Sequence, residues 1–263
     1  MPIVTLTTDF GLKDYHLAAL KGALLSRDAS LNIVDITHNV ENYDIVQAAF
    51  IFRNAWPSFP EGSIHLLSVN NYHEGRPDFL VLKRKGHYFI GPDNGLFSLI
   101  FSDPPEQAFR LDFPAHNAFP LKEIFSRAIA HLVSDAPLKK IGKPAGGILQ
   151  RLTFQPVIGP SQIRGSVIYI DNYENAIVNI RRELFEKVGQ NRPFSLYFKR
   201  HDPITRISDH YQEVPVGETL CLFNSAGYLE VAINMGKAGS LLGLGVEETV
   251  QIDFHGELPE EAD

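Results

Sequence analysis

The spacing of apolar and polar positions changes about halfway along the chain. In the first half, short apolar runs such as "PIVTLTTDF" alternate with segments in which leucines recur at helical spacing, as in "DYHLAALKGALLSR". Strands that alternate with helices are typical of βαβ units. Residues 1–150 are therefore predicted to form an α/β domain with a largely parallel sheet.

The second half contains short apolar runs separated by turn residues, which predicts a smaller all-β, barrel-like domain over residues 163–256. One short helix is expected over "RRELFEKV". Residues 151–162 contain two prolines and little periodicity, so they are expected to link the two domains.

Composition narrows the classes of partner. The 263 residues carry a net charge of −7 and no run of lysine or arginine, which argues against nucleic acid or an anionic membrane as partner. Apolar runs fall short of the roughly 20 residues of a membrane span, and no secretory signal is visible. Cys221 is the single cysteine and the ten histidines show no ligand spacing, so neither a disulfide nor a metal site is expected. A cytoplasmic location is expected.

Several polar residues stand where strands are expected to end. Asp9 follows the first strand and could bind the two hydroxyls of a ribose, or it could cap the next helix. Residues 171–175 interrupt the apolar stretch "IDNYENAIVNI", as a hairpin turn or as a ligand loop. Asp35 and His38 could pair as orienter and base, or His38 could be structural. No phosphate loop, dinucleotide fingerprint or nucleophile elbow is present.

Six segments occur in an order that resembles one known family. They are "TTDFGLKDYHLAALKGAL", "VDITHNVENYDIVQAAF", "FPEGSIHLLSV", "FIGPDNGLFSL", "IDNYENAIVNI" and "FNSAGYLEVAINMGKAGSLLGL". Together they resemble the motifs of the S-adenosylmethionine hydroxide adenosyltransferases, which are relatives of fluorinase and chlorinase. The likeness covers almost the whole chain.

The resemblance implies an S-adenosylmethionine site that needs no metal and no further cofactor. Asp9 would hold the ribose diol, Asp171 the methionine ammonium and Ser225 the methionine carboxylate. Tyr211 would stack on the adenine and Asn175 would bond to it, while the remaining residues would flank the sugar or line the pocket. The matching positions are Asp9, Tyr43, Phe119, Asp171, Tyr173, Asn175, Tyr211 and Ser225.

The chain departs from the family where the attacking water would be activated. Members of the family are expected to use an aspartate, an arginine and a histidine there. Asn70 stands in the aspartate position, Arg76 is the candidate for the arginine, and Pro120 replaces the histidine. His73 could supply an imidazole, or it could be a surface histidine.

The resemblance therefore implies a hydrolase in which water attacks ribose C5′ to give adenosine and L-methionine, with Asn70 and Arg76 at the reacting centre. The alternative is a non-catalytic binder of S-adenosylmethionine or adenosine. A third reading is an enzyme that uses another nucleophile, such as a halide, or another adenosyl substrate. The family also implies a homotrimer with the site at the subunit interface.

Overall fold

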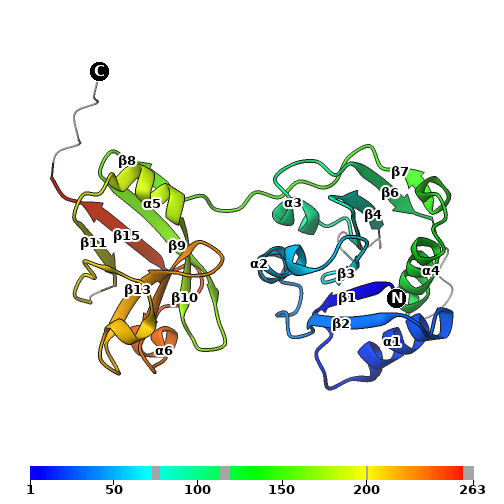
Figure 1. The fold of residues 1–263 in the computed structure, drawn as a ribbon, viewed down its shortest axis with the longest axis horizontal. Helices are drawn as coiled ribbons and strands as arrows, with labels where there is room; N and C mark the ends of the chain where they lie inside the picture. The colour runs from blue at the N-terminus through cyan, green and yellow to red at the C-terminus, as the bar shows by residue number, and fades with distance from the viewer. Residues whose placement is uncertain (73–77, 113–118, 200, 257–263) are drawn as a thin grey trace. The chain divides into compact units, whose positions relative to one another are not determined.

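The computed structural model describes residues 1–72, 78–112, 119–199 and 201–256, which divide into two compact units, residues 1–152 and 153–263 (Figure 1). Each unit has a sheet and a hydrophobic core of its own. No helix within these described ranges is long and apolar enough to cross a membrane.

The N-terminal unit is built on one sheet of mixed direction. Its strands are β1 (Ile3–Thr8), β2 (Asn32–Thr37), β3 (Ile64–Ser68), β4 (Phe79–Arg84), β5 (His87–Pro92), β6 (Gln107–Leu111) and β7 (Gly142–Pro144), in the order β2-β1-β3-β5-β4-β6-β7. The first four in this order are parallel, whereas β4, β6 and β7 join antiparallel.

The largely parallel sheet that the sequence predicted is therefore not confirmed. Lys85 and Gly86 both have positive φ, 47° and 74°, and make the tight turn between β4 and β5. A turn this short can join only antiparallel strands, because a parallel pair needs a crossover of a dozen or more residues. The hairpin thus reverses the strand direction within the sheet.

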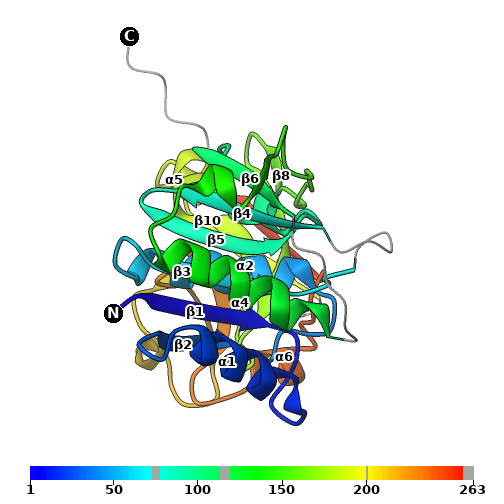
Figure 2. The same cartoon turned by 90° about the vertical axis from the view of Figure 1, so that its right-hand side faces the viewer.

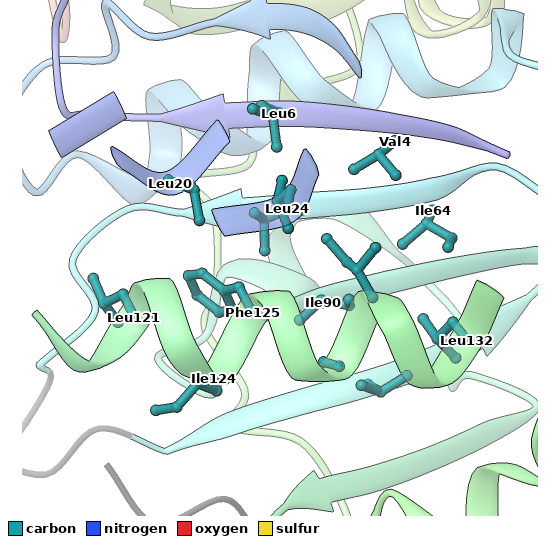
Figure 3. Close-up of a cluster of buried hydrophobic side chains, with 14 of the residues drawn as sticks. Val4, Leu6, Leu20, Leu24, Ile64, Ile90, Leu121, Ile124, Phe125 and Leu132 are labelled. Carbon is teal, nitrogen blue, oxygen red and sulfur yellow. The ribbon is translucent and has the colours of Figure 1, made fainter. Parts of the chain in front are cut away.

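Helices cover both faces of this sheet. They are α1 (Tyr15–Arg27), α2 (Ile45–Ala55), α3 (Leu96–Ile100) and α4 (Pro120–Val133), with short 3₁₀ turns η1 (Trp56–Ser58) and η3 (Leu138–Lys140). Helices α1 and α4 pack on one face, where Leu20, Phe125 and Leu132 meet Val4 and Ile90 of the strands (Figures 2 and 3). Helices α2 and α3 pack on the opposite face. The sheet is thus the middle of three layers.

The C-terminal unit is a curled sheet that forms a half-barrel. Its strands are β8 (Val157–Gly159), β9 (Gln162–Ile170), β10 (Ala176–Arg181), β11 (Phe194–Phe198), β12 (Ile207–Ser208), β13 (Thr219–Phe223), β14 (Tyr228–Ile233) and β15 (Thr249–Phe254). The order is β11-β15-β9-β10-β14-β13-β12, with β8 beside β9 and only β12–β13 parallel.

Strand β9 carries the curl, because its first half pairs with β15 and its last residues pair with β10. A Cβ added at Gly165 would lie 2.6 Å from the Asn179 side chain and 2.8 Å from that of Ile180. The close approach at this bend therefore requires glycine.

Two helices accompany the half-barrel, α5 (Arg182–Gly189) and α6 (Ala238–Leu242), together with the 3₁₀ turn η4 (Tyr211–Glu213). The short helix expected over residues 181–188 is thus confirmed as α5, whereas α6 was not expected. Strand β8 lies inside the stretch that was predicted to be only a linker.

Candidate functional site

Asp9 lies where three loops of the N-terminal unit meet. Strands β1, β2 and β3 are parallel, so their carboxyl ends lie at one edge of the sheet, the usual ligand edge of such folds. The Asp9 Oδ2 atom accepts hydrogen bonds from the backbone nitrogens of Tyr43 (3.1 Å) and Asn70 (3.3 Å). Among the described residues no hydrogen bond reaches Asp9 Oδ1, which leaves that oxygen to accept from a ligand.

Both donors have backbone in the left-handed region, with φ of 69° at Tyr43 and 50° at Asn70. This conformation is uncommon outside glycine, and such positions concentrate at functional sites. It turns each N–H toward Asp9. The expectation that Asp9 caps a helix is not met, because the N-cap of α1 is Asp14 and that of α2 is Asp44.

Asn94 holds the Asn70 loop in place, and sequence reasoning did not single it out. Its side chain is 1% exposed, and its Nδ2 donates to the carbonyls of Val69 and Asn70, each at 2.9 Å. Its Oδ1 accepts from the Leu96 nitrogen at the start of α3. The available signal was "GPDNGLF", which was read as a tight turn feeding a short helix, and that helix is α3.

Asp35 and His38 do pair, but in a structural chain that runs from the buried Thr8 through the buried His38 to the exposed Asp35. His38 Nδ1 lies 2.9 Å from Thr8 Oγ1, and its Nε2 lies 3.0 Å from Asp35 Oδ1. Burial alone would raise the pKa of Asp35, but its bonds to Lys21 and His38 outweigh burial and hold that pKa below its usual value. Both ring nitrogens of His38 face protein groups, so the ring locks the end of β1 against the end of β2.

Phe119 immediately precedes α4, and its ring meets Phe10 and His16 edge-on, with centroids 6.1 and 5.2 Å apart. This places an aromatic ring beside the loop that carries Asp9. Arg76 and His73 lie outside the described residues. Pro120 is the first residue of α4.

In the C-terminal unit, Asp171 organises the loop between β9 and β10. Its Oδ1 accepts from the backbone nitrogens of Tyr173 (2.9 Å) and Asn175 (2.8 Å), and its Oδ2 accepts from Asn175 Nδ2 (3.0 Å). Asn175 is buried, whereas Tyr173 is 74% exposed. The loop is thus a self-bonded hairpin turn that brings three of the expected site residues together.

The same loop is fastened to the start of α6 through Glu174. The Glu174 carbonyl accepts from the Gly239 nitrogen at 2.7 Å, and its carboxylate binds Lys237 Nζ at 2.7 Å and the Ser240 hydroxyl. These bonds, to Lys237 and then Ser240, hold the pKa of Glu174 below its usual value. The position of Asp171 is therefore set from both ends of its loop.

A buried carboxylate, Glu230 of β14, accompanies these residues and was not foreseen from the sequence. Its Oε1 accepts from Tyr211 Oη at 2.7 Å, and its Oε2 accepts from Asn224 Nδ2 at 3.2 Å. Burial, and then the negative charge of Asp171, raise the pKa of Glu230. Burial, the bond to Glu230 and the charges of Glu230 and Asp171 raise the pKa of Tyr211.

Asp171, Tyr211 and Glu230 thus share one electronegative region. Over the part of the chain that the structure describes, no lysine or arginine forms an ion pair with Asp171 or Glu230. Ser225 is exposed in the turn between β13 and β14, directly after Asn224. This side of the unit suits a ligand that brings positive charge.

Comparison with known proteins places both units in one family. The profile of the SAM hydroxide adenosyltransferase N-terminal domain matches residues 4–142, and that of the C-terminal domain matches residues 165–251. An (R)-S-adenosyl-L-methionine hydrolase from Thermus thermophilus is 32% identical over 90% of this chain and 94% of its own. A protein of the same name from Methanocaldococcus jannaschii is 25% identical over 97% of both chains.

The crystal structure of an uncharacterized conserved protein from Thermotoga maritima is similar throughout. It covers 95% of this chain and 99% of its own, with a TM-score of 0.84 and 26% identity. The two domain matches and the relatives agree over nearly the full length. The chain therefore belongs to the SAM hydroxide adenosyltransferase family.

Proposed function

We propose that this protein hydrolyses S-adenosyl-L-methionine to adenosine and L-methionine, with water attacking C5′ of the ribose. The observation that carries the proposal is a pair of carboxylates, Asp171 and the buried Glu230, with which no lysine or arginine of the described chain forms an ion pair. S-adenosylmethionine brings two positive charges, the ammonium and the sulfonium. Family membership and the names of the relatives support the same substrate.

Each part of the substrate has a suitable group. Asp9 Oδ1 is available to accept from the ribose hydroxyls, because only Oδ2 is engaged by the backbone. Asp171 would receive the ammonium and Ser225 the carboxylate of the methionine part. The adenine would stack on Tyr211 and donate from its amino group to Asn175 Oδ1, since Asn175 Nδ2 already donates to Asp171. The aromatic rings that would flank the ligand are those of Tyr43, Phe119 and Tyr173.

The reaction would be a direct displacement. The water oxygen forms a bond to C5′ while the C5′–S bond breaks. The electron pair of the C5′–S bond goes to sulfur and gives the neutral thioether of methionine. Because a sulfonium leaves readily, no general acid is needed and no metal or separate cofactor is required. The protein has to hold the water in line in a pocket that excludes other water.

Activation of the water is the weaker half of this site. Asn70 can orient a water through its amide but cannot accept its proton, and an arginine such as Arg76 can only lower the water's pKa. The proton would then pass to solvent. We expect turnover to be slow for this reason.

A second function follows from the same two replacements. With Asn70 in place of the family's aspartate and Pro120 in place of its histidine, the protein could retain S-adenosylmethionine or adenosine without cleaving it. The binding residues are present in both readings. Only the fate of the ligand separates them.

The proposal includes a homotrimer in which Asp9 of one subunit and Asp171 of its neighbour reach the same ligand. Large apolar side chains near Asp9 support an interface there: Leu12 is 68% exposed, Tyr15 73% and Tyr43 69%. A cytoplasmic location is also proposed, since Cys221 is a free, buried thiol and suits a reducing compartment.

The decisive experiment incubates the purified protein with S-adenosylmethionine in ¹⁸O-labelled water and separates the products by chromatography. Adenosine carrying the label, with unlabelled methionine, would support attack at C5′. Tight binding without product would favour the non-catalytic reading. Neither binding nor product would contradict both.

A further inference from the structure

Glu230 is a charged residue in a strand with no exposed face. Every residue of β14 is buried, and Glu230 itself is 3% exposed. A carboxylate in such a place is costly unless donors satisfy it. The donors found among the described residues are the Tyr211 hydroxyl at 2.7 Å and the Asn224 amide at 3.2 Å.

These two donors belong to the segments that carry proposed ligand contacts. Tyr211 lies in η4, and the residue remains 37% exposed although its hydroxyl donates to Glu230. Only the tip of the side chain is thus engaged, while part of the ring is left open to a ligand. Its bond to Glu230 removes rotational freedom that stacking would otherwise have to overcome.

Asn224 plays the corresponding part in the turn between β13 and β14. Its Oδ1 accepts from the nitrogens of Ala226 (3.0 Å) and Tyr228 (3.2 Å), so this side chain shapes the turn that displays Ser225. Its Nδ2 is held by Glu230 at the same time. One carboxylate therefore fixes both the η4 segment and the Ser225 turn.

We propose that Glu230 is a positioning residue for substrate binding, which sets the adenine-stacking ring of Tyr211 and the carboxylate-binding turn of Ser225 through its two hydrogen bonds. The inference rests on the proposed function but adds a residue that need not touch the ligand. In this proposal a single buried group pre-organises the two protein segments that would contact distant parts of the substrate.

The test compares Glu230→Gln, Tyr211→Phe, their double variant and Asn224→Ala. Glutamine keeps the size of Glu230, but its amide nitrogen cannot accept, so one of the two bonds is lost. Glu218→Gln is the matched control, because Glu218 is exposed and lies in the same unit. Calorimetry would give Kd for S-adenosylmethionine and for adenosine, turnover at saturation would give kcat, and hydrogen exchange without ligand would follow residues 209–214 and 223–228.

We expect Glu230→Gln to raise Kd for both ligands by roughly tenfold, to change kcat little, and to speed exchange in both segments. Tyr211→Phe should also raise both Kd values. Glu230→Gln should then raise Kd by a smaller factor in the Tyr211→Phe background than in the wild type. Asn224→Ala should weaken S-adenosylmethionine binding more than adenosine binding, because only the former carries a carboxylate for Ser225. Glu218→Gln should behave as wild type.

Binding by Glu230→Gln that equals the control would overturn the inference, as would fully additive effects in the double variant. Tyr211→Phe probes the same bond from a partly exposed side chain, so the test survives if the Glu230 variant does not fold. If the wild-type protein binds neither ligand, the proposed function fails. If the wild-type protein binds both ligands and Glu230→Gln binds them equally well, only the role of Glu230 is overturned.

Discussion

The carboxylate of Asp9 shows how one side chain can organise residues that are far apart in the sequence. Its Oδ2 atom binds backbone nitrogens 34 and 61 residues away, at Tyr43 and Asn70. Each of those residues has positive φ, a conformation that needs support from its surroundings. Asp9 therefore has a structural task as well as a proposed ligand contact.

Replacing Asp9 with asparagine should separate these two tasks. The amide oxygen can still accept from Tyr43 and Asn70, but the negative charge offered to the ribose hydroxyls is lost. We expect S-adenosylmethionine and adenosine to bind about ten- to a hundredfold more weakly, with thermal stability little changed. Calorimetry and thermal unfolding would measure this.

Asp14→Asn makes the same chemical change at an exposed N-cap that forms no side-chain cap bond, and it should leave both affinities unaltered. Unchanged affinity in the Asp9 variant would remove that residue from the proposed site.

Asn70→Asp should restore an acceptor for the proton of the attacking water. Aspartate tolerates the left-handed backbone that position 70 requires, so the loop should keep its shape. We expect the kcat of the wild type to rise with pH between about pH 6 and 9, and that of the variant to be higher and nearly level. Product formation over this range, corrected for breakdown of S-adenosylmethionine without protein, gives the profile.

A wild-type profile that levels off near neutral pH would instead indicate a histidine base, and His73 would be the first to replace. Equal profiles for the two proteins would show that position 70 does not act on the water.

The sequence offered Asp9 and Asp171 as candidates more readily than the groups around them. Asp9 follows a clear strand and belongs to a motif of the family. Asparagine adopts positive φ more readily than most residues, so Asn70 carried a weak signal, whereas nothing in the residue type of Tyr43 indicates its positive φ. Glu230 was missed because alternation along "YLEVAI" would turn it to solvent. The structure buries both faces of β14, which a single strand's pattern cannot reveal.

At the scale of elements, β3 and β5 carry a pair of buried histidines. His65 Nδ1 lies 2.8 Å from Thr5 Oγ1, and its Nε2 lies 3.2 Å from His87 Nδ1. Burial, and then the nearby charge of His87, lower the pKa of His65 to about 3. Burial also lowers the pKa of His87, against the influence of Glu61. Both imidazoles are therefore neutral in the folded protein at neutral pH.

These histidines should make the protein less stable as the pH falls. The unfolded chain takes up a proton at each histidine near pH 6.5, whereas folded His65 resists it until about pH 3, so acid favours unfolding. We expect His65 alone to reduce the free energy of unfolding by about 1.4 kcal/mol per pH unit below its unfolded pKa. Urea titrations between about pH 6.5 and 4.5 cover the window before most carboxylates titrate.

His65→Gln is the matched variant, because glutamine can still donate and accept between Thr5 and His87 but does not titrate. Its stability should fall less steeply over the same range. Identical slopes would mean that His65 is protonated in the folded state.

The elements were predicted correctly where the hydrophobic pattern was long. The prediction failed for a glycine-rich helix and for the direction of strands in the sheet. The leucine spacing located α1. Helix α6 was missed because "GKAGSLLGL" has several glycines, which disfavour a helix, and the stretch that contains it was read as strand–turn–strand. Strand direction depends on which strands become neighbours, and the pattern of one strand does not contain that information.

At the scale of the whole molecule, the proposed trimer should determine both the mass in solution and the affinity for S-adenosylmethionine. A site shared between subunits requires assembly for tight binding. We expect light scattering coupled to size-exclusion chromatography to give a mass three times the 29.4 kDa of one chain. A mass of one chain at every concentration, with full S-adenosylmethionine affinity, would contradict the shared site.

Trp56 gives the protein an optical label that reports on one unit alone. It is the single tryptophan, it is 8% exposed, and its ring lies 5.2 Å from that of His87. Its fluorescence should shift to longer wavelength when the N-terminal unit opens, whereas far-ultraviolet dichroism follows both units. If the two units unfold separately, the two signals will give different midpoints. The native chain thus allows the stability of its two halves to be compared without any added dye.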